Sequence, residues 1–170
     1  MKRFKLFLLF LTWLPAYGLL AQNFEVPKGY KFEKAEDYAS YEKDVIACVN
    51  WLERSPIRYE QERRVEANRF FVLWIQGSPT VSIELGKMAI DLAGKNKDML
   101  VLFMGGYTRF VLENPEKSND KLAANIAALK CVIKFYELNL DKGVVKDKNI
   151  EKIISMDKKG KLSDWVAKQI

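Results

Sequence analysis

The sequence predicts an all-α, single-domain bundle of five to six helices. Three observations lead to this fold class. Apolar residues recur with a helical period along most of the chain. The most apolar stretch outside the N-terminus spans 98–113 and fits a buried central helix, and 170 residues with 49% hydrophobic residues suit one domain with a full core. We therefore expect residues 35–170 to form one helical domain.

Residues 1–21 have the composition of a cleaved signal peptide. Three basic residues lie within the first five positions, an apolar run covers 6–20, and Ala21 offers a small residue for cleavage before Gln22. A retained membrane anchor is the alternative, but the run contains a proline and a glycine and is shorter than the ~20 residues of a spanning helix. We expect an exported protein, periplasmic or secreted, that is not an integral membrane protein after cleavage.

Residues 22–34 are expected to form an extended N-terminal arm, because they contain Pro27 and Gly29 and show no helical period. Four apolar residues alternate along this arm and can dock it on the bundle: Phe24, Val26, Tyr30 and Phe32. The first helix is predicted over 35–54 and ends before Pro56, since a residue that precedes proline leaves the helical region.

The second helix is predicted over 60–76, with Gly77 as its C-terminal cap. The next segment, 80–93, is ambiguous. Residues 80–85 alternate as in a short strand, whereas the wider apolar spacing fits a helix. We expect a short extended stretch followed by a helix from about Ser82.

The central helix is predicted over 98–113, with Asp98 as its N-cap. Its inward stripe consists of Leu100, Phe103, Met104, Tyr107, Phe110 and Val111. A long amphipathic helix is expected from Asp120 to residue 140, a shorter one over 147–156, and a final amphipathic turn or two within 162–170.

Two adjacent glycines interrupt the central helix. Gly105 and Gly106 each cost a helix about 1 kcal/mol relative to alanine, so a compensating interaction is expected. Close approach of another helix, such as 60–76, would supply it. The alternative is a local opening beside Tyr107 and Arg109 that binds a ligand.

Both cysteines, Cys48 and Cys131, fall on apolar helix faces. In an oxidising compartment they can form one disulfide, which would stabilise the fold by about 4 kcal/mol in the chain-entropy model. Two separate buried thiols that pack as small hydrophobic groups are the equal alternative. Neither cysteine has a CxxC spacing or a neighbouring histidine, so the sequence gives no sign of a reactive thiol.

The charge of the chain does not indicate a nucleic-acid partner. Removing the three basic residues of the signal peptide from the 28 in the chain leaves 25 against 22 acidic ones, a net charge near +3. This excess lies within 141–170, where lysines outnumber acids by eight to five. A lysine-rich end is usually a solvated surface, and attraction to an anionic membrane or glycan is the alternative.

The chain contains no histidine, which removes histidine-based nucleophilic catalysis, histidine-ligated zinc and a histidine general base. It also has no phosphate-binding glycine loop. We expect no cofactor and no metal. An enzyme would need carboxylate or Ser-Lys chemistry, and the scattered acids give no catalytic pattern, so the sequence favours a protein that is not an enzyme.

Arg109 is a lone charge in an apolar helix and must reach solvent, an acidic partner or an anionic ligand. We expect an ion pair with Glu113 or with an acid of helix 60–76. If the helix opens instead, Arg109 and Tyr107 are candidate binding residues.

Five arginines lie between positions 54 and 69, and guanidinium groups suit the recognition of carboxylates or phosphates. Interleaved glutamates can neutralise this cluster through the i,i+4 pairs Glu60 with Arg64 and Arg58 with Glu62. Arg63 and Arg69 lie outside those pairs and are therefore the candidate binding residues of the cluster.

The functional class that the sequence favours is a small exported helical binding protein whose partner is another envelope or secreted protein. A histidine-free, carboxylate-dependent hydrolase of cell-wall or other glycan is the first alternative, and it would need two carboxylates in one cleft. A structural subunit of an envelope complex is the second.

Overall fold

The computed structural model describes residues 24–170, and all of its regular elements are helices. The expected signal peptide and the first two residues of the arm lie outside this range. The elements are α1 (Ala35–Ser40), α2 (Glu42–Arg54), α3 (Gln61–Gly77), α4 (Lys87–Leu92), α5 (Asp98–Glu113), the 3-10 helix η1 (Pro115–Lys117), α6 (Lys121–Asn139), α7 (Lys148–Lys158) and α8 (Leu162–Val166). The predicted all-α fold is confirmed.

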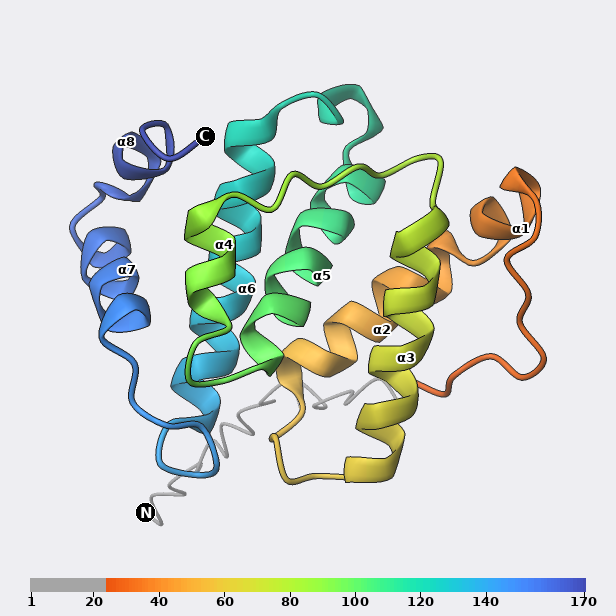
Figure 1. Cartoon of the computed structure of the whole chain (residues 1–170), viewed down its shortest axis with the longest axis horizontal. Coiled ribbons are helices and arrows are strands. Elements are labelled where there is room, and N and C mark those ends of the chain that lie inside the picture. Colours follow the sequence, from red (N-terminus) through yellow and green to blue (C-terminus); the bar gives the residue numbers. More distant parts are fainter. Residues whose placement is uncertain (1–23) are drawn as a thin grey trace, which may run out of the picture.

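The central position of α5 is confirmed as well. Figure 1 shows α5 between α3 on one side and α4 on the other, while α7 and α8 lie beyond α4. The most extensive helix contact in the described chain is that of α5 with α6, and α2 packs on α5 next. Eight residues of α5 are buried, including Tyr107 and both glycines, so this helix has neighbours on most of its surface.

Two boundaries differ from the prediction. Tyr41 leaves the helical conformation and divides the predicted helix 35–54 into α1 and α2. Partly for this reason, the described residues form eight α-helices, whereas five to six were predicted. The expected helix from Ser82 begins only at Lys87. Residues 80–86 form an extended segment that crosses one end of α5 (Figure 1) and buries Val81 as in a strand, although no partner strand lies beside it among the described residues.

Residues 24–34, the described part of the expected arm, contain no helix and pack on the bundle. Phe24 is buried between Trp51 of α2 and Phe70 of α3, with ring centroids 6.5 and 6.3 Å away. Tyr30 meets Phe70 edge-on at 5.1 Å. Such aromatic pairs contribute about 0.5–1.5 kcal/mol each beyond burial, so they hold the arm on the bundle.

The glycine pair allows the close helix contact that the sequence predicts, but with different neighbours. A Cβ atom on Gly106 would lie 2.6 Å from Cβ of Cys131 and 2.9 Å from Cα of Ala128, both on α6. A Cβ atom on Gly105 would lie 3.1 Å from a methyl group of Val49 on α2. The helices that approach are therefore α6 and α2, and the expectation of helix 60–76 was wrong.

Buried amides fix the loops at one end of the bundle. The Oδ1 atom of Asn139 accepts a hydrogen bond from the backbone of Ile57 at 2.7 Å. Asn96 exchanges two hydrogen bonds of 2.9 Å with the backbone of Val145. Because these amides are buried and paired, they fix the turns around α4 and α6 without a strand.

Within residues 24–170, no helix has the length and apolar character that crossing a bilayer requires.

Candidate functional site

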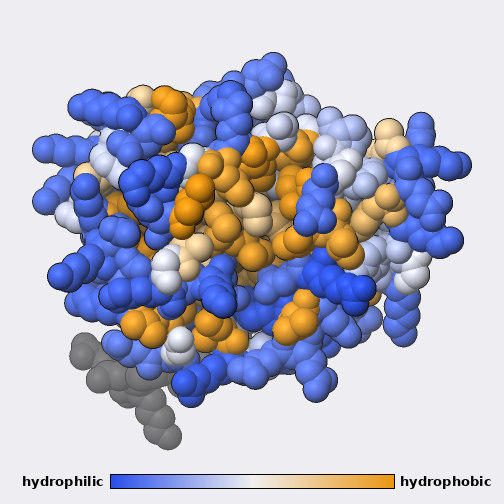
Figure 2. Space-filling view, viewed as in Figure 1, coloured by the Kyte–Doolittle hydropathy of each residue, from blue (hydrophilic) through white to orange (hydrophobic). Residues whose placement is uncertain are grey.

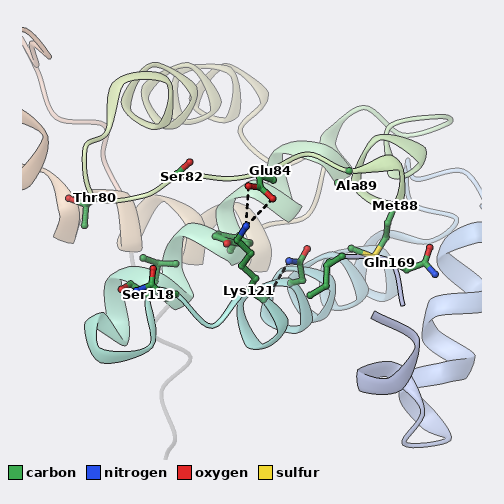
Figure 3. Close-up of a pocket in the computed structure, with 14 residues that line it drawn as sticks. Thr80, Ser82, Glu84, Met88, Ala89, Ser118, Lys121 and Gln169 are labelled. Carbon is green, nitrogen blue, oxygen red and sulfur yellow. Dashed lines mark hydrogen bonds and ion pairs between the residues drawn. The ribbon is translucent and has the colours of Figure 1, made fainter. Parts of the chain in front are cut away.

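The candidate site is a cavity of about 510 Å³ that lies where the extended segment 80–86 passes the start of α6. Its walls come from that segment, from Tyr107 and Val111 of α5, from residues 118–125 and from the chain end at 169–170. Figure 3 shows Glu84 on one wall facing Lys121 on the other. We call it the Tyr107 cavity. Its volume lies within the range of about 300–1,000 Å³ that is typical of small-molecule sites.

Tyr107 is the predicted binding residue that the structure places in this cavity. Its ring is almost fully buried, with 5% of the residue exposed. Burial raises the pKa of its phenol, the charge of Lys121 acts in the opposite direction, and Glu84 adds to the increase. The hydroxyl therefore stays protonated at neutral pH and can donate a hydrogen bond.

An ion pair crosses the cavity. Nζ of Lys121 lies 3.0 Å from both carboxylate oxygens of Glu84. Both side chains are more than half exposed, and an exposed pair of this kind is worth only about 0–1 kcal/mol. The bridge can therefore open at little cost in stability.

Arg109, the second predicted candidate on α5, does not share this site. It lies two positions after Tyr107, which turns it to the other side of the helix, where its guanidinium donates to Glu53 at 2.5 Å and to Asn50 at 2.6 Å, both on α2. The expectation that Arg109 forms an ion pair is confirmed, but the expected partners, Glu113 or an acid of helix 60–76, were wrong.

The carboxylate of Glu53 is the buried centre of a charge cluster. The residue is 3% exposed and also accepts a hydrogen bond of 3.1 Å from Lys134 on α6. Burial acts to raise the pKa of Glu53, but the charge of Arg109 and the hydrogen bonds from Arg109 and Lys134 outweigh it and lower the pKa. Glu53 is therefore ionised, and Arg109 and Lys134 balance its charge, as in a structural ion pair rather than a catalytic acid.

The arginine cluster is divided among different roles. Arg63 forms an ion pair with Glu60 at 2.6 Å, so its placement outside the paired residues was wrong. Arg64 is buried rather than paired with Glu60: it donates to the carbonyl of Ser55 at 2.7 Å. Its guanidinium also lies over the rings of Trp51 and Phe135.

Arg69 remains exposed on the outer side of α3, with no ion-pair partner among residues 24–170. It lies between Val65 and Leu73 at i,i+4 spacing, and both of these apolar residues are exposed. Of the two arginines chosen from the sequence, Arg69 is thus the one with a free guanidinium next to apolar surface.

Both cysteines are free, buried thiols in the structure. Cys48 donates to the carbonyl of Ala67 at 3.4 Å, while Cys131 lies beside Glu53. Burial raises the pKa of each thiol far above its usual value. A thiol that stays protonated is a poor nucleophile and a poor metal ligand.

A second feature of note is an apolar face. Figure 2, viewed as Figure 1, shows hydrophobic atoms gathered across the middle of the molecule, over α3, α4, α5 and the segment that crosses them. On α5, Val101 and Met104 are half-buried and lie roughly opposite Gly106, which faces α6, so the expectation that Met104 belongs to the inward stripe was wrong. Exposed apolar side chains on the flanking elements are Leu73 of α3, Leu85 of the extended segment and Ile90 of α4.

Three cavities of the described chain are each lined by a single acidic side chain. Glu84 of the Tyr107 cavity is paired with Lys121, and Asp91 of a neighbouring 230 Å³ cavity is paired with Lys87 at 2.8 Å. A third cavity has Asp164 alone. Glycoside hydrolysis needs two converging carboxylates, and none of these three cavities supplies such a pair.

No group of three or more acidic or cysteine side chains within the described chain is arranged to hold a metal ion.

Comparisons with models of protein families, with curated proteins and with solved structures find no match to this chain.

Proposed function

We propose that the protein is a small exported binding protein that docks another envelope or secreted protein on its apolar face. The observation that carries this proposal is the apolar surface shared by α3, α4, α5 and the segment 80–86 (Figure 2). A large contiguous apolar patch is unfavourable on an otherwise polar protein and is typical of an interaction site.

The chemistry of the face indicates what it binds. Leu73, Leu85 and Ile90 are exposed on three different elements that flank α5, and Val101 and Met104 of α5 are half-buried. Such a surface suits an apolar helix face or an extended segment with several aliphatic anchors. Arg69 lies one turn from Leu73 and provides a charge at the rim, so the partner is expected to carry an acidic residue beside its apolar anchors.

Export is the second part of the proposal. It is supported by the basic residues, the apolar run and the small residue at position 21 in the N-terminal sequence. Fractionation of the native host followed by mass spectrometry of the N-terminus tests it. A mature chain that begins near Gln22 in the periplasm or medium is expected, and an uncleaved chain in the membrane fraction would contradict export.

Site-specific crosslinking tests the docking face. A photoreactive residue is introduced in the native host at Ile90, which is 57% exposed, and in a matched control at Val145, which is 58% exposed and lies in the loop after α6. A protein captured at Ile90 and not at Val145 is then purified and titrated with the mature chain. We expect Leu73→Glu to abolish its binding and Val145→Glu to leave its binding unchanged.

Other outcomes would refute the proposal. Equal capture at both positions would mean that the face is not selective. Capture of a second copy alone would mean that the face serves self-association. No loss of affinity in Leu73→Glu would place the captured protein elsewhere on the surface.

A further inference from the structure

The polar walls of the Tyr107 cavity indicate a small-molecule site that is separate from the apolar docking face. Two polar groups on its walls have hydrogen-bonding capacity that the described chain does not use. The hydroxyl of Tyr107 makes no hydrogen bond to any residue in 24–170, and its oxygen is not among the fully buried unpaired atoms, so it is accessible from the cavity although the rest of the residue is almost fully buried.

Asn125 of α6 is in a similar position on the same cavity. Its amide nitrogen donates to the carbonyl of Lys121 at 2.8 Å, which fixes the orientation of the side chain. Its Oδ1 atom accepts no hydrogen bond from the described chain, and the residue is 7% exposed. The cavity therefore offers a fixed acceptor and a fixed hydroxyl on two neighbouring helices.

The charge of the cavity indicates a neutral ligand. The charged side chains that line it are Glu84 and Lys121, and they cancel each other by pairing. These two side chains therefore contribute no net charge that would attract an ionic ligand, which favours a neutral one.

The rest of the lining suits a ligand rich in hydroxyl groups. Hydroxyl and amide side chains both donate and accept hydrogen bonds, as sugar hydroxyls do. Such side chains on the walls are Ser82, Ser118, Asn119 and Gln169, and their polar groups make no side-chain hydrogen bond within residues 24–170. Met88, Ala89 and Val111 supply small apolar surfaces for the C–H faces of a sugar ring.

We propose that the Tyr107 cavity is a binding site for a neutral carbohydrate of disaccharide size. The hydroxyl of Tyr107 and Oδ1 of Asn125 hold two of its hydroxyl groups, and the Glu84–Lys121 pair closes over it.

Methyl NMR on the mature protein tests this proposal, because Met88 lines the cavity and the whole chain has only five methionines. The Met88 signal is assigned with Met88→Leu. The probes are three neutral disaccharides, N,N′-diacetylchitobiose, cellobiose and maltose. The zwitterionic dipeptide dialanine represents a charged ligand that is not a carbohydrate. We expect a saturable shift of the Met88 methyl signal with at least one disaccharide and none with dialanine.

Variants locate the binding. Tyr107→Phe removes a hydroxyl that has no partner in the described chain, so the variant should fold with an unchanged melting temperature and bind the disaccharide about three- to tenfold more weakly. Tyr59→Phe is the matched control, since Tyr59 is exposed and does not line the cavity. The proposal is overturned if no disaccharide shifts Met88, if dialanine does so instead, or if Tyr107→Phe binds as tightly as the unmodified protein.

Discussion

Replacing Glu53 by glutamine is expected to destabilise the fold by about 3 kcal/mol. The change removes the charge that neutralises Arg109, whose side chain is only 15% exposed, and removing one partner of a buried pair costs about 3–5 kcal/mol. The lower end applies because Arg109 keeps its hydrogen bond to Asn50. For a chain of this size the loss corresponds to a fall of roughly 6–12 °C in melting temperature.

The assay is urea unfolding at several pH values, with two further variants. Lys134→Met removes an exposed partner of the same carboxylate and should change stability by at most about 1 kcal/mol. The double variant Glu53→Leu with Arg109→Met removes both buried charges and should recover most of the loss. Equal stability of Glu53→Gln and the unmodified protein, or a double variant less stable than Glu53→Gln, would refute the reasoning.

The pH dependence follows from the lowered pKa of Glu53 in the folded state. At pH values between the folded and unfolded pKa, the unfolded chain binds more protons, so stability rises with pH. The contribution of Glu53 is therefore complete above the unfolded value of about 4.3 and is lost as the pH falls through the folded pKa. The stability difference between the unmodified protein and Glu53→Gln should shrink in that acidic range.

Further predictions concern the helix contacts and the thiols. Gly106→Ala should destabilise the protein by about 2–3 kcal/mol in thermal melts because its new methyl group meets the backbone of α6, and Gly105→Ala should cost less because it meets only a side chain that can shift. Arg64→Met should cost about 2 kcal/mol in urea unfolding, since a charged hydrogen bond to a buried carbonyl is lost. A thiol reagent such as DTNB should not label Cys48 or Cys131 in the folded protein and should label both in urea; no labelling in urea would reveal a disulfide.

The long helices were predictable because their apolar stripes are regular. The prediction of 98–113 for the central helix matches α5 at both ends, but Asp98 as its N-cap was wrong, because Asp98 is the first helical residue and Lys97 takes the cap position. The helix expected from Asp120 begins at Lys121, and Asp120 caps it by accepting a 2.9 Å hydrogen bond from the backbone of Ala123. The segment 80–86 was harder, since Val81 and Ile83 alternate like a strand that has no neighbouring strand in the described chain. Its extended conformation depends on the surface of α5 beneath it, which local spacing does not reveal.

The buried charges show a different limit. Glu53 continues the stripe of Val45 and Val49 at i,i+4 spacing, and Arg64 continues that of Ala67 and Phe71, so a burial signal for both was present in the sequence. The sequence around each residue does not show which residue it pairs with in the folded protein. Arg109 lies 56 positions from Glu53, and only the crossing of α2 over α5 brings them together.

The same glycine pair connects stability to the candidate site. Gly106 lets α6 approach α5 closely at Ala127 and Ala128, one turn after Asn125. This contact sets how far the amide of Asn125 lies from the hydroxyl of Tyr107, one residue after Gly106 on α5. A methyl group at position 106 would therefore displace the two proposed sugar-binding groups relative to each other, whereas one at position 105, which faces α2, would not. The close packing of α5 and α6 is thus both the main helix contact of the fold and the geometric basis of the proposed binding site.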